Sequence, residues 1–217
     1  VGSTYSVETS TYSLSYWYPT SYLNVYALLR GSEKEHLVRA RYDGYLGIGT
    51  YTFSTNYVIS PMSTWKYKMS EVPSDWKTSS GDGWSEGNTN TFVAGTNRIQ
   101  LYKKTFSVST VSGSAGFVLS LRYKYACVVY MNGNEVFRNG VSGDISTSSS
   151  ISNTYADVMF RQVTLPIKSM ATSDTAAVTY LQSGSNTISV GLVANSDTST
   201  DSVFDCAVRV INNSYEH

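Results

Sequence analysis

Residues 126–137, ACVVYMNGNEVF, contain two short apolar runs separated by Asn132-Gly133. Cys127, Val129 and Met131 are two residues apart, the spacing of a β-strand with one buried face. Asn-Gly adopts positive φ angles at little cost and is typical of the two-residue turn of a β-hairpin. This stretch therefore predicts a β-hairpin with one face in the core.

The same alternation recurs on both sides of this hairpin. Three further apolar sets share the two-residue spacing: Phe117, Leu119, Leu121 and Tyr123; Ile188, Val190, Leu192 and Ala194; and Phe204, Cys206, Val208 and Val210. More amphipathic strands are expected at 102–108 and 163–167. Gly140–Asn153 is predicted as an exposed loop, and short helical pieces are predicted only within Ser169–Leu181. Many strands, polar turns and little helix predict an all-β jelly-roll sandwich of about eight or more antiparallel strands.

The first 58 residues differ from the rest and form a further β-rich segment. A second hairpin is predicted there, with arms Leu23–Arg30 and Leu37–Tyr42 joined by the charged turn Gly31–Glu35. We expect residues 1–58 to supply extra strands or to be the remnant of a preceding domain. The sandwich is then expected at 59–211, followed by a tail at 212–217.

Composition favours an extracellular or cell-surface protein that recognises sugars or proteins. Charged residues make up only 15% of the chain, and tyrosine occurs 18 times. Tyrosine provides surface for stacking and hydrogen bonding without a dominant charge. Lys+Arg and Asp+Glu balance at 16 each without a basic stripe, which argues against a nucleic-acid partner. No apolar run is long enough for membrane insertion.

The sequence lacks the motifs of common catalytic sites, so we expect no enzymatic activity. No Gly-x-Ser-x-Gly or His-Glu-x-x-His motif occurs, and the carboxylates are isolated from one another. The two cysteines, Cys127 and Cys206, both fall in predicted strands. Two interpretations remain open for them, a pair of buried free thiols and a disulfide between strands.

Short motifs between residues 59 and 205 occur in an order that resembles one family. They are Trp65-Lys66-Tyr67, Pro73-Ser74-Asp75-Trp76, Asp82-Gly83-Trp84, Leu101–Phe106, Val128–Arg138, Leu181–Asn186 and Asp201–Asp205. This order resembles the galactose-binding-like jelly-roll domains, carbohydrate-binding modules that are appended to secreted hydrolases and surface proteins. The resemblance covers roughly 150 of the 217 residues and implies fold more directly than ligand.

The resemblance implies a lectin-like recognition module that binds carbohydrate or glycoprotein through loops at one end of the sandwich. Aromatic and basic residues are the candidates for ligand contact: Tyr16, Trp17, Tyr18, Trp84, Arg138 and Tyr155. For Trp84 the alternative is packing within the fold, and for Arg138 it is a solvated side chain. Trp17 has the alternative of sealing the joint with the N-terminal segment.

Acidic loop residues in such modules often hold a structural Ca²⁺, and three residues are the candidate ligands here: Asp197, Asp201 and Asp205. The chain departs from the family pattern at Lys124-Tyr125-Ala126, where an acidic pair is common. Solvated carboxylates are therefore the alternative to a calcium site.

A structural role is the second interpretation. Low charge and abundant strand-forming residues also suit an adhesive subunit of a surface coat or fibre, with protein partners in that assembly.

Overall fold

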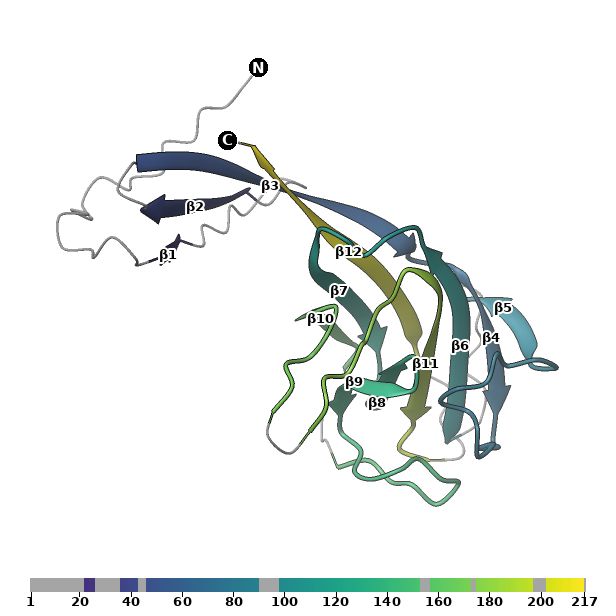
Figure 1. Cartoon of the computed structure of the whole chain (residues 1–217). Helices are drawn as coiled ribbons and strands as arrows, with labels where there is room; N and C mark the ends of the chain where they lie inside the picture. Colours follow the sequence, from purple (N-terminus) through teal and green to yellow (C-terminus); the bar gives the residue numbers. More distant parts are fainter. Residues whose placement is uncertain are drawn as a thin grey trace. The chain divides into compact units, whose positions relative to one another are not determined.

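The computed structural model describes residues 55–89, 98–152, 157–172, 175–196 and 202–212 in full (Figure 1). It also describes the strand backbone at 22–25, 36–42, 46–54 and 213–216. The chain forms two compact units, residues 1–54 with 213–217 and residues 55–212. The prediction had placed the corresponding boundary after residue 58.

The described strands belong to two antiparallel sheets. The first has the order β1 (Tyr22–Val25), β2 (His36–Tyr42), β3 (Leu46–Ile59), β12 (Phe204–Glu216), β7 (Ser114–Tyr123) and β10 (Met159–Leu165). The second has the order β5 (Ser85–Asn88), β4 (Thr64–Met69), β6 (Ile99–Val108), β11 (Gly184–Val193), β8 (Ala126–Met131) and β9 (Asn134–Asn139). The described residues contain no helix, so none could cross a bilayer as a helix. The predicted all-β sandwich is confirmed.

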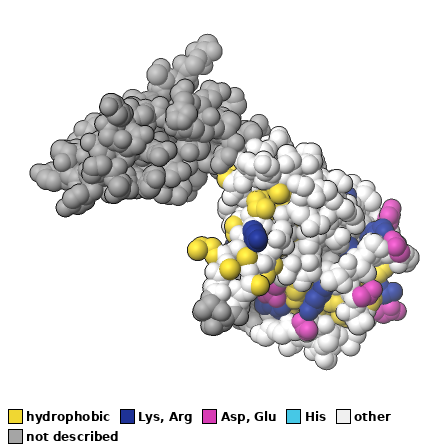
Figure 2. Space-filling view, viewed as in Figure 1, with side chains coloured by type: hydrophobic (Ala, Val, Ile, Leu, Met, Phe, Trp, Pro, Cys, Tyr) yellow, Lys and Arg dark blue, Asp and Glu magenta, His cyan; other side chains and the backbone are white. Residues whose placement is uncertain are grey.

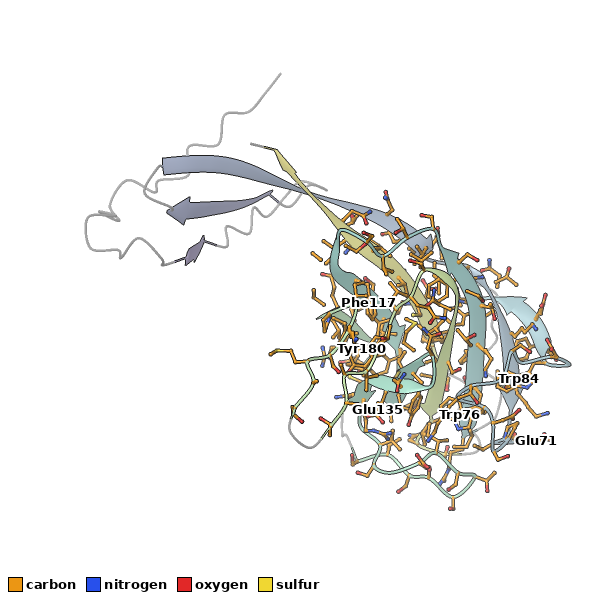
Figure 3. All side chains as sticks on the ribbon, in the orientation of Figure 1. Glu71, Trp76, Trp84, Phe117, Glu135 and Tyr180 are labelled. Atoms are coloured by element: carbon orange, nitrogen blue, oxygen red, sulfur yellow. The ribbon has the colours of Figure 1, made fainter. Side chains whose placement is uncertain are left out.

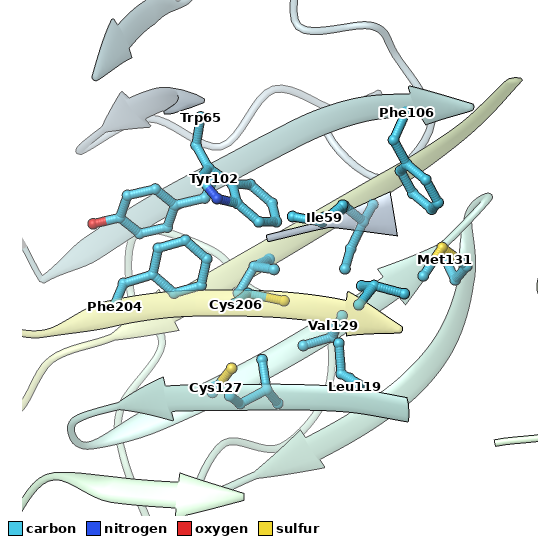
Figure 4. Close-up of a cluster of buried hydrophobic side chains, with 14 of the residues drawn as sticks. Ile59, Trp65, Tyr102, Phe106, Leu119, Cys127, Val129, Met131, Phe204 and Cys206 are labelled. Carbon is cyan, nitrogen blue, oxygen red and sulfur yellow. The ribbon is translucent and has the colours of Figure 1, made fainter. Parts of the chain in front are cut away.

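The main core of the larger unit lies between the inner faces of the two sheets (Figure 4). Phe204 of β12 packs edge-on against Trp65 of β4, with ring centroids 5.2 Å apart. The same ring stacks on Tyr102 of β6 at 4.1 Å. Aromatic pairs of these two geometries are favourable beyond the area that they bury. Phe204 therefore joins the first sheet to two strands of the second.

The predicted hairpin at Asn132-Gly133 is confirmed as the β8–β9 connection. Asn132 has φ 51° and Gly133 has φ 80°, as a type I′ turn requires. The Asn132 side-chain amide donates to the Asn186 side-chain oxygen at 2.8 Å, and its own oxygen accepts from the Thr187 N–H at 2.9 Å. The turn is thus tied to the start of β11.

The two arms of the predicted N-terminal hairpin pair where they are described, β1 with β2 from Tyr22↔Arg41 to Val25↔Val38. The predicted turn Gly31–Glu35 lies outside the described residues. At the other end of the chain, β12 continues to Glu216 where a tail from residue 212 was predicted. The pairing of β12 with β7 shifts register between Ile211 and Asn212, and the Asn212 side chain accepts a hydrogen bond from Ser114 Oγ at 3.0 Å.

The prediction of helical pieces within Ser169–Leu181 is wrong for the described residues. Backbone hydrogen bonds run from Ser169 N–H to the Val178 carbonyl and from Tyr180 N–H to the Ile167 carbonyl, at 2.8 and 2.9 Å. These bonds join two antiparallel arms. The local helix propensity of Met and Ala is overridden by this long-range pairing.

Loops cover the outer face of the second sheet and form a second core there. Trp76 and Trp84, both labelled in Figure 3, come from the loop before β5, and Ile145 comes from the loop after β9. Gly191 of β11 makes room for this cover, since a Cβ at that position would lie 2.4 Å from Ile145 Cδ1. Most of the predicted exposed loop is exposed over residues 140–152, but Val141 and Ile145, each 4% exposed, turn inward and join this core.

The two cysteines are free thiols buried in the main core, Cys127 on β8 and Cys206 on β12 (Figure 4). The structure therefore agrees with the first of the two interpretations that the sequence left open, a pair of buried free thiols. Burial raises the pKa of both thiols far above the usual value, which leaves almost no thiolate at neutral pH. Since the thiolate is the reactive form, both cysteines should be inert in the folded protein.

Titration with a disulfide-exchange reagent tests this state. We expect no rapidly reacting thiol in the native protein at pH 7.5 and two reacting thiols per chain after denaturation without reductant. Denatured protein that reacts only after reduction would show that the two sulfurs are joined.

Candidate functional site

The sequence-predicted ligand contacts fall into two groups. Tyr16, Trp17, Tyr18 and Tyr155 lie outside the described residues. Trp84 and Arg138 are described, and both contact loops that cover the second sheet.

Trp84 is half-buried at the margin of the second core. The ammonium of Lys103 lies 5.4 Å from the centre of its ring. Lys103 Nζ also donates to the Ser79 carbonyl and to Ser79 Oγ. Trp84 thus packs within the fold and holds the loop before β5 on the sheet, the alternative that the sequence had left open.

Arg138 is held in an internal network. Its guanidinium donates to both carboxylate oxygens of Glu135, at 2.8 and 2.6 Å, and to the Tyr130 hydroxyl at 3.0 Å. It also donates to the Val141 and Gly143 carbonyls at 3.3 and 2.7 Å. The pKa of Glu135 is lowered, first by its hydrogen bond with Arg138. Arg138 thereby clamps the loop after β9, and these bonds occupy all three of its nitrogens.

Asp205 is the one predicted calcium ligand within the described residues. Its carboxylate accepts from the Met62 N–H at 3.0 and 3.2 Å and from the Thr89 hydroxyl at 2.8 Å. It thereby pins the turn between β3 and β4 to β12. Asp197 and Asp201 lie outside the described residues, and the described part contains no group of three His, Cys, Asp or Glu residues placed to hold a metal. Calcium binding stays a prediction.

A hollow of about 340 Å³ lies on the outer face of the first sheet, where β10, β7 and β12 run side by side. The inner face of these strands carries Leu121, Tyr123 and Cys206 of the main core, so their sequence neighbours point outward. The register aligns one outward row across the three strands, Phe160, Arg122 and Asp205. The adjacent outward row is Gln162, Ser120 and Ala207.

The shape of this hollow follows from side-chain size. Ser120 and Ala207 are short and form its floor, while Phe160 and Gln162 rise from β10 on one side. Pro61, in the turn held by Asp205, lines the other side. Phe160 is 69% exposed, unusual for a large apolar side chain. We call this feature the β10–β7–β12 groove.

Charges in the groove differ from those over the second sheet. Over the second sheet, ion pairs with acidic residues are formed by Lys66, Lys68, Lys77 and Arg138. Figure 2 shows acidic and basic side chains next to one another on the face in view. Arg122 is exposed. Among the described residues it forms no hydrogen bond or ion pair. The groove thus presents an aromatic ring, an amide and an unpaired guanidinium together.

Sequence reasoning missed Arg122, Phe160 and Gln162, although one signal was available. Val163 and Leu165 were predicted to point into the core, and the same two-residue spacing leads back along β10 to Met159. The residues between these positions, Phe160 and Gln162 among them, therefore point outward. A phenylalanine at an outward strand position is the signal. Its proximity to Arg122 depends on the β7–β10 register, which the sequence alone does not give.

Comparisons with known proteins find a distant structural similarity only. No protein-family model matches the chain, and no curated protein matches it in sequence. Among solved structures, a β-glucuronidase from Ruminococcus gnavus in complex with uronic isofagomine is 12% identical, with a TM-score of 0.42. The match covers 74% of this chain and 28% of that one.

Two other solved structures are similar to the chain. A glycosyl hydrolase family 2 member from Bacteroides cellulosilyticus is 12% identical over 72% of this chain and 20% of its own, with a TM-score of 0.44. A β-glucuronidase from Bifidobacterium dentium is 15% identical over 64% of this chain and 20% of its own, with a TM-score of 0.36. The chain spans less than a third of the length of each of these three proteins.

Proposed function

We propose that residues 55–212 form a non-catalytic carbohydrate-recognition module of an extracellular or cell-surface protein. The observation that carries the proposal is the exposed Phe160 ring beside Arg122 and Gln162 in the β10–β7–β12 groove. The C–H face of a sugar ring packs on an aromatic ring, while polar groups beside it bind the hydroxyls. The proposed ligand contact is on a sheet face instead of on the end loops that the family resemblance implies.

The ionisation of the acidic residues supports a binding role over a hydrolytic one. A general acid in glycoside hydrolysis needs a carboxyl group whose pKa is raised. Among the described residues, the carboxyl groups with a shifted pKa are Asp82, Glu135 and Asp144, and a basic or hydroxyl hydrogen-bond partner lowers the pKa of each. None of the three lines the groove.

Assembly is a second candidate function, favoured by the position of β10. This strand is last in its sheet, so one of its hydrogen-bonding edges has no strand partner among the described residues. An unpaired edge can accept a strand from another chain. A surface-coat or fibre subunit would use such an edge.

Glycan-array binding, followed by titration calorimetry, tests the recognition proposal. We expect saturable sugar binding by a monomer, with Phe160→Ala weakening affinity by about tenfold, roughly 1.4 kcal/mol of lost stacking. Met170→Ala is the matched control, because Met170 is 88% exposed and does not line the groove.

Size-exclusion chromatography with light scattering separates the two functions. Oligomers that form with increasing concentration, together with no retained sugar, would support assembly and reject the groove as a sugar site.

A further inference from the structure

We infer that the ligand of the β10–β7–β12 groove is an acidic saccharide, whose carboxylate or sulfate group is bound by Arg122. This inference rests on the proposed function and names its ligand class. Phe160, Arg122 and Asp205 form one register row across β10, β7 and β12. Arg122 is the middle residue, directly opposite the exposed ring on β10 and the carboxylate on β12.

The carboxylate of Asp205, opposite Arg122 in the register, is engaged with the turn between β3 and β4. It accepts hydrogen bonds from the Met62 N–H and the Thr89 hydroxyl, and no ion pair joins it to Arg122 among the described residues. Cross-strand opposite charges usually pair when nothing else holds them. Here the turn between β3 and β4 holds the acid, so the neighbouring guanidinium stays available to a ligand.

Arg161 does not add its charge to this outward row, because its register partner is Leu121 of the main core and its Nη2 lies 4.0 Å from Met159 Sδ. Its Nη1 donates to the Phe160 carbonyl at 3.3 Å, and the side chain is exposed. It forms no ion pair with an acidic residue of the described part. Arg122 is therefore the basic side chain of the outward row, and the carboxylate beside it is already hydrogen-bonded to the turn between β3 and β4.

The chemistry of the guanidinium selects the anion. Arginine presents N–H donors in a planar fork that matches the two oxygens of a carboxylate or the oxygens of a sulfate ester. The hollow, about 340 Å³, lies at the small end of the usual range for ligand pockets. It suits one or two sugar residues, with one ring face on Phe160 and the acidic group on Arg122.

Calorimetry with matched acidic and neutral saccharides tests the inference. The probes are hexuronate oligosaccharides with their carboxyl-reduced counterparts, and sulfated chondroitin oligosaccharides with their desulfated counterparts. We expect the acidic member of one pair to bind about tenfold more tightly than its partner at low salt. The preference should weaken as ionic strength rises, and the pair that shows it identifies the anion as carboxylate or sulfate.

Three variants separate the contributions. Arg122→Gln should abolish the acidic preference and its salt dependence while neutral binding changes less than twofold. Phe160→Ala should weaken acidic and neutral ligands alike. Lys168→Gln, which removes one positive charge from an exposed residue outside the groove, should leave the preference intact.

The outcomes distinguish this inference from the function on which it rests. Equal binding of acidic and neutral sugars that depends on Phe160 would overturn the acidic preference and leave carbohydrate recognition standing. An acidic preference that survives in Arg122→Gln would also overturn the inference. Absence of binding by every saccharide, neutral ones included, would reject both.

Discussion

Replacing Asn186 by alanine is expected to lower the free energy of unfolding by about 4 kcal/mol, a large part of the usual stability of a single domain. Asn186 is 1% exposed. Its amide donates to the Gln182 and Gly184 carbonyls at 2.8 and 3.0 Å. Its oxygen accepts from the Gln182 N–H at 3.0 Å and from Asn132 Nδ2 at 2.8 Å.

Alanine would leave these four partners without Asn186, and each partner that is left unsatisfied in a buried place costs about 1–3 kcal/mol. Asn132 keeps its bond to the Tyr180 carbonyl at 3.0 Å, which limits the total. Urea unfolding followed by tyrosine and tryptophan fluorescence measures the change as a lower midpoint at constant m-value.

Asn134→Ala provides the control for this prediction. Asn134 is half-buried, and its side chain makes one long hydrogen bond, 3.2 Å to the Asn132 carbonyl. We expect it to cost less than about 1 kcal/mol. Equal losses in the two variants would show that the Asn186 network adds nothing beyond an ordinary turn contact.

The fold was predictable because its two main signals are local. Alternation at Phe117–Tyr123 and Phe204–Val210 shows which face of each strand is buried, and Asn132-Gly133 specifies its turn by backbone conformation alone. The contact between Asn132 and Asn186 was not predictable. It depends on the pairing of β8 with β11, whose residues are more than 50 positions apart in the chain.

The site was harder to predict because surface position depends on which loops cover which sheet. Trp84 was a reasonable candidate by residue type, but its loop folds onto the second sheet, where Lys103 and the second core hold the ring. The first sheet keeps an uncovered hollow over Ser120 and Ala207. Two short residues at outward positions carry no recognisable motif, so only the structure identifies this groove.

Lys103 is expected to make the protein more stable as pH rises from about 8 to about 10. Its side chain is 0% exposed, and burial lowers its pKa from 10.5 to about 8, with Asp75 opposing and Lys66 adding to the shift. In the unfolded chain this lysine keeps its proton up to about pH 10.4. Between these values the unfolded state binds more protons than the folded state, so the free energy of unfolding increases with pH.

The variant Lys103→Met isolates this contribution, since methionine fills much of the same space without an ionisable group. The stability of the wild-type protein relative to Lys103→Met should rise by about 2–3 kcal/mol between pH 7.5 and pH 10, measured by urea unfolding at each pH. Burial raises the pKa of Tyr123 to about 12, and burial raises that of Tyr102 further. Both tyrosines are present in the wild-type protein and in Lys103→Met. The stability that each protein loses when these tyrosines ionise above pH 10 therefore cancels in the difference.

Lys168→Met, at an exposed position, controls for the removal of one positive charge and should show a flat difference over the same range. A relative stability that falls with rising pH would contradict the prediction for Lys103. It would mean that the bonds from the ammonium to Ser79 and its contact with the Trp84 ring outweigh the cost of burial. The sign of the slope thus decides whether the protein tolerates this buried charge or depends on it to hold the loop that carries Trp84.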